Sequence, residues 1–291
     1  MTMTESLELR GSAGADEVCR LSLGIIGFGA IASELLKLIE PLPLERLILL
    51  VSPGGEARAR ERLVASHPAL VGRMQVTERL DDLIVARPGL VVEAAGHGAV
   101  DAHAARLLET GIDLLLVSIG ALSDQALHNR LKAAAVRGGA RILLPAGAIG
   151  GVDLLSALSA RGALKVRYFG TKPPSAWRGT PVAETIDLER LSAPLEFFHG
   201  NAREAARNYP KNANVAATLA LAGAGFEATE VTLIADPAAT GNSHRYEVSS
   251  PLANYSVEIT NRATDGNAKT SVSTVYSVLR EIRNQIGPVA I

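Results

Sequence analysis

The feature that most constrains this sequence is a glycine-rich turn between an apolar run and an amphipathic segment. Leu21–Ile26 is typical of a buried strand, and Gly27-Phe28-Gly29-Ala30-Ile31-Ala32 follows it directly. In this G-x-G-x-x-A pattern the first glycine permits a tight turn, the second lets the backbone approach a pyrophosphate, and the alanine allows close packing of helix on strand. The helix N-terminus offers free N–H groups to the phosphates. We therefore predict a dinucleotide site rather than an ordinary glycine turn, with contacts from Gly27, Gly29, Ala30 and Ile31.

The chain that follows this turn repeats a pattern of one strand and then one helix. Further apolar runs at 47–51, 90–95, 112–117 and 141–144 are separated by segments with helical spacing. Strands joined by helical crossovers pair in parallel, and near-continuous apolar strands are typical of a sheet covered on both faces. The pattern predicts an α/β fold that begins with a Rossmann-type parallel sheet.

Beyond about residue 145 the pattern changes. Segments 164–169, 231–235, 245–248 and 255–260 alternate apolar with polar residues, as half-exposed strands do. The last two are close enough to pair antiparallel, so this part is predicted to be α+β with a mixed or antiparallel sheet. We expect four parts: a disordered leader (1–20), a dinucleotide-binding domain (21–145), a substrate, catalytic and dimerisation domain (146–265), and a C-terminal helix that packs back on the first domain (266–291).

Charge and cysteine content exclude several classes of partner. The formal net charge is −1, so there is no basic excess for nucleic acid or an anionic membrane. Cys19 is the single cysteine, which rules out an internal disulfide. No apolar run approaches the ~18 residues of a membrane span, and the first residues do not read as a signal peptide. We expect a cytoplasmic protein without a nucleic-acid or membrane partner, and no residue spacing indicates a metal site.

The end of the second predicted strand bears on the choice of cofactor. An acid about 20 residues past the glycine turn usually binds the ribose 2′-OH. Ser52 stands there instead, with Arg58 and Arg60 close behind. No carboxylate at this position opposes a 2′-phosphate, so we expect NAD or NADP as cofactor, NADP being accepted through Ser52 and Arg58. The alternative is that the arginines lie on a solvated helix face.

Two histidines are candidates for proton transfer. A dinucleotide-dependent oxidoreductase needs a proton donor or acceptor beside the carbon that exchanges hydride, and histidine suits this near neutral pH. His97 follows the predicted strand 90–95, at an edge where open α/β sheets bind ligands. His244 ends a polar turn just before another strand. Spacing leaves both open, together with a purely structural role for either.

Other polar residues are candidates for ligand contacts. Lys172 ends a predicted strand, where it faces either a substrate carboxylate or solvent. Asn212 and Asn214 precede a helical run and would either cap it or contact nicotinamide or substrate. Asn242 and Ser243 lie in the polar turn before His244, and together with Lys172 they are the expected substrate contacts.

Several stretches resemble L-aspartate dehydrogenases, NAD(P)-dependent enzymes related in fold to dihydrodipicolinate reductase and homoserine dehydrogenase. The resemblance runs from about residue 21 to the end of the chain, and PKNANVAATLAL and PAGAIGG are its most specific parts. The matching stretches are Gly24–Ala32, Val91–Val100, Leu116–Asp124, Leu144–Gly151, Gly170–Pro174, Gly200–Leu221 and Thr240–His244.

The resemblance implies that Ala148 and Asn214 contact the nicotinamide cofactor and that His244 is the active-site residue. The sequence departs from the family at Ser52, where an acid is expected, and at His97, where a smaller or amide side chain is expected.

The implied reaction is the reversible oxidative deamination of L-aspartate to oxaloacetate and ammonium through iminosuccinate. Iminosuccinate is a precursor of quinolinate, which implies a role in NAD biosynthesis. The half-exposed second sheet suggests a surface that a homodimer would bury. Two alternatives remain at this point: a dehydrogenase or reductase of another amino-acid-derived substrate, and a non-catalytic NADP(H)-binding redox sensor.

Overall fold

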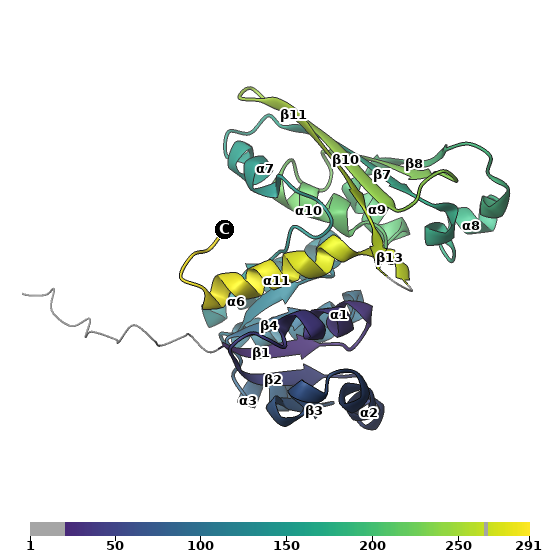
Figure 1. Ribbon diagram of the computed structural model, residues 1–291. Coiled ribbons are helices and arrows are strands. Elements are labelled where there is room, and N and C mark those ends of the chain that lie inside the picture. The colour runs from purple at the N-terminus through teal and green to yellow at the C-terminus, as the bar shows by residue number, and fades with distance from the viewer. Residues whose placement is uncertain (1–20, 265–266) are drawn as a thin grey trace, which may run out of the picture.

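The computed structural model describes residues 21–264 and 267–291 and contains two main β-sheets (Figure 1). The leader expected at residues 1–20 lies outside the described residues. Within the described part of the chain, no helix has the length and apolar character needed to cross a bilayer.

The first sheet has six strands in the order β3-β2-β1-β4-β5-β6, and every pairing is parallel. This confirms the predicted Rossmann-type sheet. The strand order reverses between β1 and β4, so the carboxyl ends of these strands open the crevice in which such sheets bind ligands. The strands are β1 (Leu21–Ile26), β2 (Leu44–Leu50), β3 (Met74–Thr77), β4 (Leu90–Glu93), β5 (Asp113–Leu116) and β6 (Ile142–Leu143).

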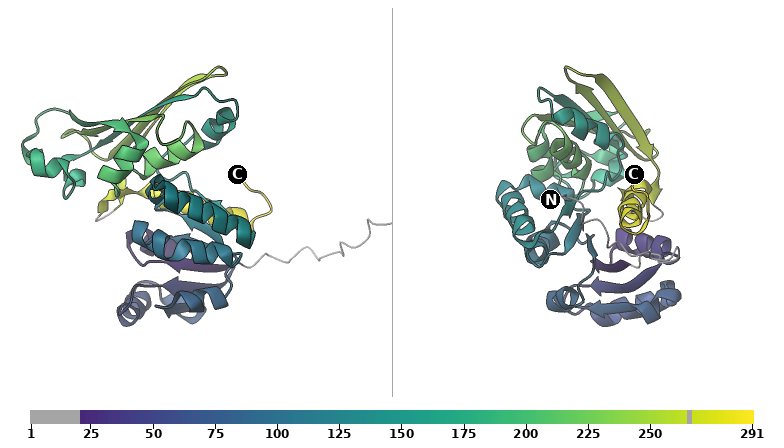
Figure 2. Two further views of the ribbon diagram at one scale, coloured as in Figure 1. Left: turned by 180° about the vertical axis from the view of Figure 1, so that it is seen from behind. Right: turned by 90° about the vertical axis from the view of Figure 1, so that its left-hand side faces the viewer.

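Helices cover both faces of this sheet (Figure 2). Alternate residues of each strand enter two separate apolar cores, because successive side chains of a strand point to opposite faces: Leu23 and Ile25 belong to one core, and Ile26 to the other. The central strands β1, β4 and β5 are therefore apolar over most of their length. The connecting helices are α1 (Ala30–Ile39), α2 (Glu56–Ser66), α3 (Leu80–Val85), α4 (His97–Ala99), α5 (Ala105–Glu109) and α6 (Gln125–Gly138).

The second sheet has five strands in the order β11-β10-β7-β9-β8. Only the β7–β9 pair is parallel among these, so the predicted mixed sheet and the predicted antiparallel pairing of β10 with β11 are both confirmed. The strands are β7 (Lys165–Lys172), β8 (Leu195–Asn201), β9 (Thr229–Ala235), β10 (Asn242–Ser249) and β11 (Asn254–Asn261).

One face of the second sheet packs on helices, and Figure 1 shows no helix on the opposite face. The covered face buries Tyr168, Leu233 and Tyr246. The covering helices are α7 (Val152–Ser159), α9 (Ala202–Asn208) and α10 (Asn214–Ala222), and a short helix, α8 (Val182–Thr185), lies between β7 and β8 in the chain.

The chain passes between the two sheets twice. The first passage, residues 144–151, leads from β6 to α7. On the second, the short strands β12 (Ala263–Thr264) and β13 (Asn267–Ser271) lead into α11 (Val272–Ile286), which lies against α1 (Figure 1). Val275, Val278, Leu279 and Ile282 of α11 complete the core on the α1 side of the first sheet. Both passages border the space between the sheets.

Candidate active site

The turn after β1 has the geometry that a pyrophosphate requires. Gly27 has φ +94°, and a Cβ there would lie 2.7 Å from the Cβ of Ala95, so a larger residue does not fit. A Cβ at Gly29 would meet nothing within 4 Å, which leaves that side of the turn open. Gly29 precedes α1 without a side-chain cap, and Ala30 and Ile31 begin the helix. Their N–H groups are thus directed at the open side, where a phosphate fits.

Four of the predicted cofactor contacts surround one cavity of about 710 Å³. It extends from Gly27 and Gly29 to Ser52 at the end of β2 and Arg58 on α2. The residues present therefore fit a dinucleotide whose pyrophosphate lies on the first turn and whose adenosine lies toward β2.

A buried carboxylate fixes the two loops that follow β4 and β5. Glu93 ends β4 and has no exposed surface. It accepts hydrogen bonds from the N–H groups of Ala95 (2.7 Å) and Gly96 (2.8 Å), and from the N–H and Oγ of Ser118, both at 3.0 Å. Burial raises the pKa of Glu93, and these hydrogen bonds oppose that rise. The loop that carries Ala95 is thereby held against Gly27.

A smaller pocket of about 110 Å³ lies between the two sheets. Residues from both sheets and from the first passage line it, so it forms only where the two halves meet. Among its lining residues are Ile31, Ala148, Lys172, Asn214, Asn242 and His244, six residues that the sequence predicted as contacts.

His244 contacts Tyr168 across a glycine of the neighbouring strand, β7. It lies on β10, is 3% exposed, and its Nδ1 is 2.7 Å from the Tyr168 hydroxyl. Gly170 of β7 pairs with His244 across the sheet. Because Gly170 has no side chain, the Tyr168 ring leans over it and reaches the imidazole from two residues away.

Burial sets the protonation state of this pair. Burial, together with the smaller effect of the nearby Lys172 ammonium, lowers the pKa of His244 to about 3. Burial also raises the pKa of Tyr168 well above its ordinary value. Near neutral pH the imidazole is therefore uncharged and the phenol protonated.

A buried ammonium group shares the pocket with His244. Lys172 is 4% exposed, donates to Oδ1 of Asn212 at 3.0 Å, and lies 5.4 Å from the Trp177 ring centroid. A buried cation facing a cavity suits a carboxylate ligand. Lys211 also lines the pocket.

Asn212, two residues before α10, and Asn214, its first residue, serve the site instead of capping the helix. The N-cap residue of α10 is Ala213, without a side-chain hydrogen bond. Asn212 accepts from Lys172, and Oδ1 of Asn214 accepts from Gly120 N at 2.9 Å. This hydrogen bond connects α10, which packs on the second sheet, to the loop after β5.

Ser243 is not brought into this pocket. It lies between Asn242 and His244 on β10 and is half-buried, whereas both neighbours are buried. Successive side chains of a strand point to opposite faces, so Ser243 faces away from the pocket and we leave it out of the site.

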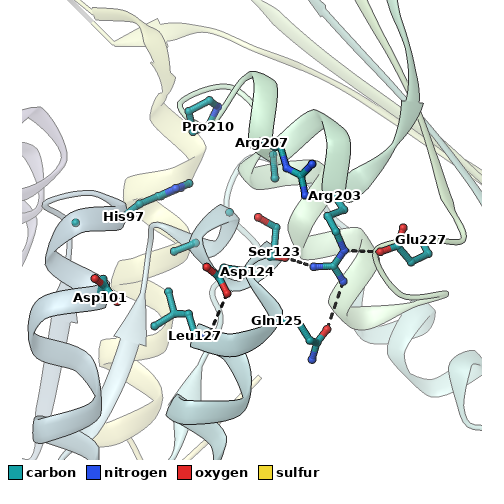
Figure 3. A pocket seen from close by; sticks show the side chains of 14 residues that line it. His97, Asp101, Ser123, Asp124, Gln125, Leu127, Arg203, Arg207, Pro210 and Glu227 are labelled. Carbon is teal, nitrogen blue, oxygen red and sulfur yellow. Dashed lines mark hydrogen bonds and ion pairs between the residues drawn. The ribbon is translucent and has the colours of Figure 1, made fainter.

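His97, the other candidate histidine, lines a different cavity, of about 1020 Å³ (Figure 3). Its Nε2 is buried without a hydrogen-bond partner among the described residues, and burial lowers the pKa of His97. Across the cavity, Arg203 of α9 bonds to the Ser123 carbonyl, Gln125 and Glu227. Of these two histidines, His244 is the one that lines the pocket with Lys172 and Asn214, which favours it as the candidate for proton transfer.

Tyr168 and Glu93 were not predicted from the sequence. In the sequence, Tyr168 cannot be distinguished from the other apolar residues of its strand. Its role in holding His244 becomes visible only through the diagonal contact across Gly170. Glu93 reads as the polar end of an apolar run. Among the described residues, no group of three or more histidine, cysteine, aspartate or glutamate residues is placed to hold a metal ion.

Two family profiles match the chain. The profile described as aspartate dehydrogenase, C-terminal, matches residues 153–285, and the homoserine dehydrogenase NAD-binding domain profile matches residues 27–145. L-aspartate dehydrogenase of Pseudomonas aeruginosa is 44% identical over 274 residues, 93% of this chain and 100% of that protein. L-aspartate dehydrogenase 2 of Bordetella pertussis is 43% identical, over 91% of this chain and 96% of that protein.

Solved structures agree with these matches. Aspartate dehydrogenase from Thermotoga maritima superposes with a TM-score of 0.71 at 26% identity, covering 94% of this chain and 100% of that one. A hyperthermophilic archaeal homoserine dehydrogenase in complex with NADPH shares the fold, with a TM-score of 0.56 at 12% identity, over 92% of this chain and 98% of that one. The chain belongs to the aspartate dehydrogenase family and is an NAD(P)-dependent oxidoreductase.

Proposed function

We propose that this protein catalyses the reversible, NAD(P)-dependent oxidative deamination of L-aspartate to oxaloacetate and ammonium through iminosuccinate. The observation that carries the proposal is the pairing, in one pocket, of an uncharged buried imidazole, His244, with a buried ammonium, Lys172. Ala148 and Asn214 border the same pocket and are the proposed nicotinamide contacts. The relatives named L-aspartate dehydrogenase support the choice of substrate.

The charges of the pocket suit a dicarboxylate. Lys172, held by Asn212 at 3.0 Å, is the proposed partner of one substrate carboxylate. Lys211 is exposed and borders the pocket, which supports it as the proposed partner of the second carboxylate. The amide of Asn242 completes the proposed polar lining.

His244 is the proposed proton carrier. When bound, the dinucleotide would supply the hydride acceptor, so that loss of a hydride from Cα and of a proton from the amino group gives iminosuccinate. His244 then takes a proton from the water that attacks the imine carbon and returns it to the nitrogen of the resulting carbinolamine. The C–N bond breaks as the carbinolamine hydroxyl loses its proton to solvent, which gives oxaloacetate and ammonia, and ammonia takes up a proton to become ammonium. The Tyr168 hydroxyl both donates and accepts hydrogen bonds, so it holds the imidazole at Nδ1 in either tautomer while Nε2 exchanges the proton.

The test is aspartate-dependent formation of reduced dinucleotide by the wild-type protein and by His244→Ala. We expect the variant to lose roughly 10²- to 10⁴-fold in kcat, the usual contribution of a positioned acid–base group, and to bind dinucleotide as before. Unchanged activity of the variant would remove His244 from the mechanism. A panel of L-glutamate, L-asparagine and L-homoserine tests the substrate, since a better rate with any of them contradicts the choice of aspartate.

We further propose that the protein acts in the cytoplasm as a homodimer without a nucleic-acid or membrane partner, and that its iminosuccinate feeds pyridine nucleotide biosynthesis. The face of the second sheet that carries Phe169 and Ile234 is half-buried and, in Figure 1, free of helices, which suits a second copy of the chain. Sedimentation equilibrium tests the dimer. A monomer mass at micromolar concentration would contradict it.

A further inference from the structure

A carboxylate from β3 lies beside the turn that follows β2. Glu78 directly follows β3, and the Thr77 carbonyl accepts a hydrogen bond from Val51 N at 2.9 Å, which places Glu78 next to Ser52. Thr77 Oγ1 donates to Asp82 Oδ2 at 2.6 Å and fixes the turn that presents Glu78. Glu78 and Ser52 line the same cavity. A carboxylate therefore lines the cavity beside the end of β2, although it comes from the residue that follows β3.

This carboxylate occupies the amino end of α2. Glu78 Oε1 accepts a hydrogen bond from Glu56 N at 2.9 Å. The backbone N–H groups of Glu56, Gly54 and Gly55 lower the pKa of Glu78, so the group is ionised near neutral pH. A phosphate on the adenosine ribose would need N–H groups of this kind, and here they already have an anionic partner.

The arginines of α2 offset this negative charge only in part. Arg60 donates to Glu56 Oε1 at 2.8 Å. Arg62 donates to the Phe28 carbonyl at 2.9 Å and lies 4.4 Å from the centroid of the Phe28 ring. Arg58, in the first turn of α2, and Arg62 both line the cavity, so two cations and a carboxylate share it, and Arg62 is already bonded to the Phe28 carbonyl.

We propose that Glu78 is a specificity-determining residue, which makes the dinucleotide site bind NAD(H) in preference to NADP(H). Its carboxylate accepts hydrogen bonds from the hydroxyls of the adenosine ribose and repels a 2′-phosphate at the same position. Ser52 alone indicates that NADP(H) binds readily. The neighbouring Glu78 changes the relative affinities in favour of NAD(H). The inference rests on the proposed function, because it presupposes that the cavity binds the dinucleotide.

The experiment compares dissociation constants for NADH and NADPH, measured by titration calorimetry, in the wild type and in Glu78→Gln. Glutamine keeps an oxygen that accepts from Glu56 N, so the turn is retained while the charge is removed. We expect the ratio of the NADPH to the NADH dissociation constant to fall at least about tenfold, which equals about 1.4 kcal/mol. Adenosine 2′,5′-bisphosphate and 5′-AMP, used as probes without nicotinamide, should show the same shift.

Two further variants keep the test decisive. Glu61→Gln removes an exposed charge from the same helix outside the cavity and should leave the ratio unchanged. Adding Ser52→Asp to Glu78→Gln returns a carboxylate to the end of β2 and should restore the wild-type ratio. If both dinucleotides bind the wild type and Glu78→Gln leaves the ratio unchanged, this inference is wrong while the proposed function stands. If neither dinucleotide binds the wild type, the proposed function itself fails.

Discussion

The Tyr168 hydroxyl and Nδ1 of His244 lie 2.7 Å apart although the two residues are not opposite each other in the sheet. His244 pairs with Gly170, and Tyr168 pairs with Tyr246. The diagonal contact therefore depends on a strand position that carries no side chain. Because the imidazole is buried, this contact determines which way its other nitrogen points.

Substituting Gly170 should disturb the imidazole without touching it. A Cβ at this position would lie 2.7 Å from the Tyr168 hydroxyl and 3.1 Å from Cζ, so Gly170→Ala should displace the ring. We expect kcat to fall roughly tenfold, about 1.4 kcal/mol of barrier, with dinucleotide affinity retained. Gly72→Ala is the matched control, since its Cβ would meet nothing within 4 Å. Equal kcat values for the two variants would contradict the role given to Gly170.

Removing the Tyr168 hydroxyl alone should show whether Tyr168 positions His244 or only packs in the core. Tyr168→Phe keeps the ring and loses the hydrogen bond to His244, so kcat should drop by roughly tenfold while KM for aspartate changes little, as expected when orientation of a proton carrier is lost. Tyr276→Phe, at an exposed residue of α11, serves as the control. Steady-state kinetics check both, and a change confined to KM would show that Tyr168 acts on substrate binding.

The Lys172 ammonium should matter for substrate and not for dinucleotide. Lys172→Met retains an apolar chain beside Trp177 but removes the charge that faces the pocket. Truncating one partner of a buried charge pair costs about 2 kcal/mol or more, so kcat/KM for aspartate should fall roughly 30-fold with the NADH dissociation constant unchanged. Lys165→Met, at the exposed start of the same strand, should behave as wild type. A parallel loss of NADH affinity would place Lys172 in the cofactor site instead.

His244 should make stability depend on pH. Its folded-state pKa of about 3 lies below the value of 6.5 for a free histidine. Between these two values the folded protein binds fewer protons than the unfolded chain, so the free energy of unfolding falls as pH drops through this window. His244→Gln should reduce that slope, and His199→Gln, at an exposed residue, should not. Denaturant titrations from about pH 7 to about pH 4 measure it, and identical slopes for His244→Gln and the wild type would contradict the buried neutral state.

Glu93 should be needed for stability as well as for the site. Its carboxylate accepts four hydrogen bonds from Ala95, Gly96 and Ser118. Glu93→Gln replaces one oxygen with a donor, which leaves a buried N–H group facing other N–H groups. Such a loss costs about 1–3 kcal/mol, so the melting temperature should fall and the NADH dissociation constant rise. Unchanged values for both would mean that water or a shifted loop replaces the lost acceptor.

Sequence patterns were informative where one local rule fixes the conformation. The turn at Gly27 and Gly29 and the buried strands of the first sheet follow from glycine geometry and from continuous apolar runs, and the structure confirms the predicted fold class. Four of the described strands were missed, namely β3, β8, β12 and β13. β3, Met74–Thr77, is only four residues long, and β8 has a register irregularity between Glu196 and Phe198 that breaks the alternation of apolar and polar residues.

The site was predictable only in part, because its key contacts join residues far apart in the chain. The polar turn before β10 favoured His244, but spacing alone left His97 open as a second candidate. The diagonal from Tyr168 across Gly170 depends on strand register, which local patterns do not specify. Similarly, the carboxylate of Glu78 meets the turn at Ser52 only because β2 and β3 are neighbours.

The return of α11 to the first sheet makes the nucleotide-binding half discontinuous in the chain. Val275, Val278, Leu279 and Ile282 close a core whose other members lie before residue 118. During synthesis that core therefore stays open until α11, Val272–Ile286, has left the ribosome. A fragment that ends near residue 145 would expose this apolar surface to water, and aggregation is the expected fate of such surfaces.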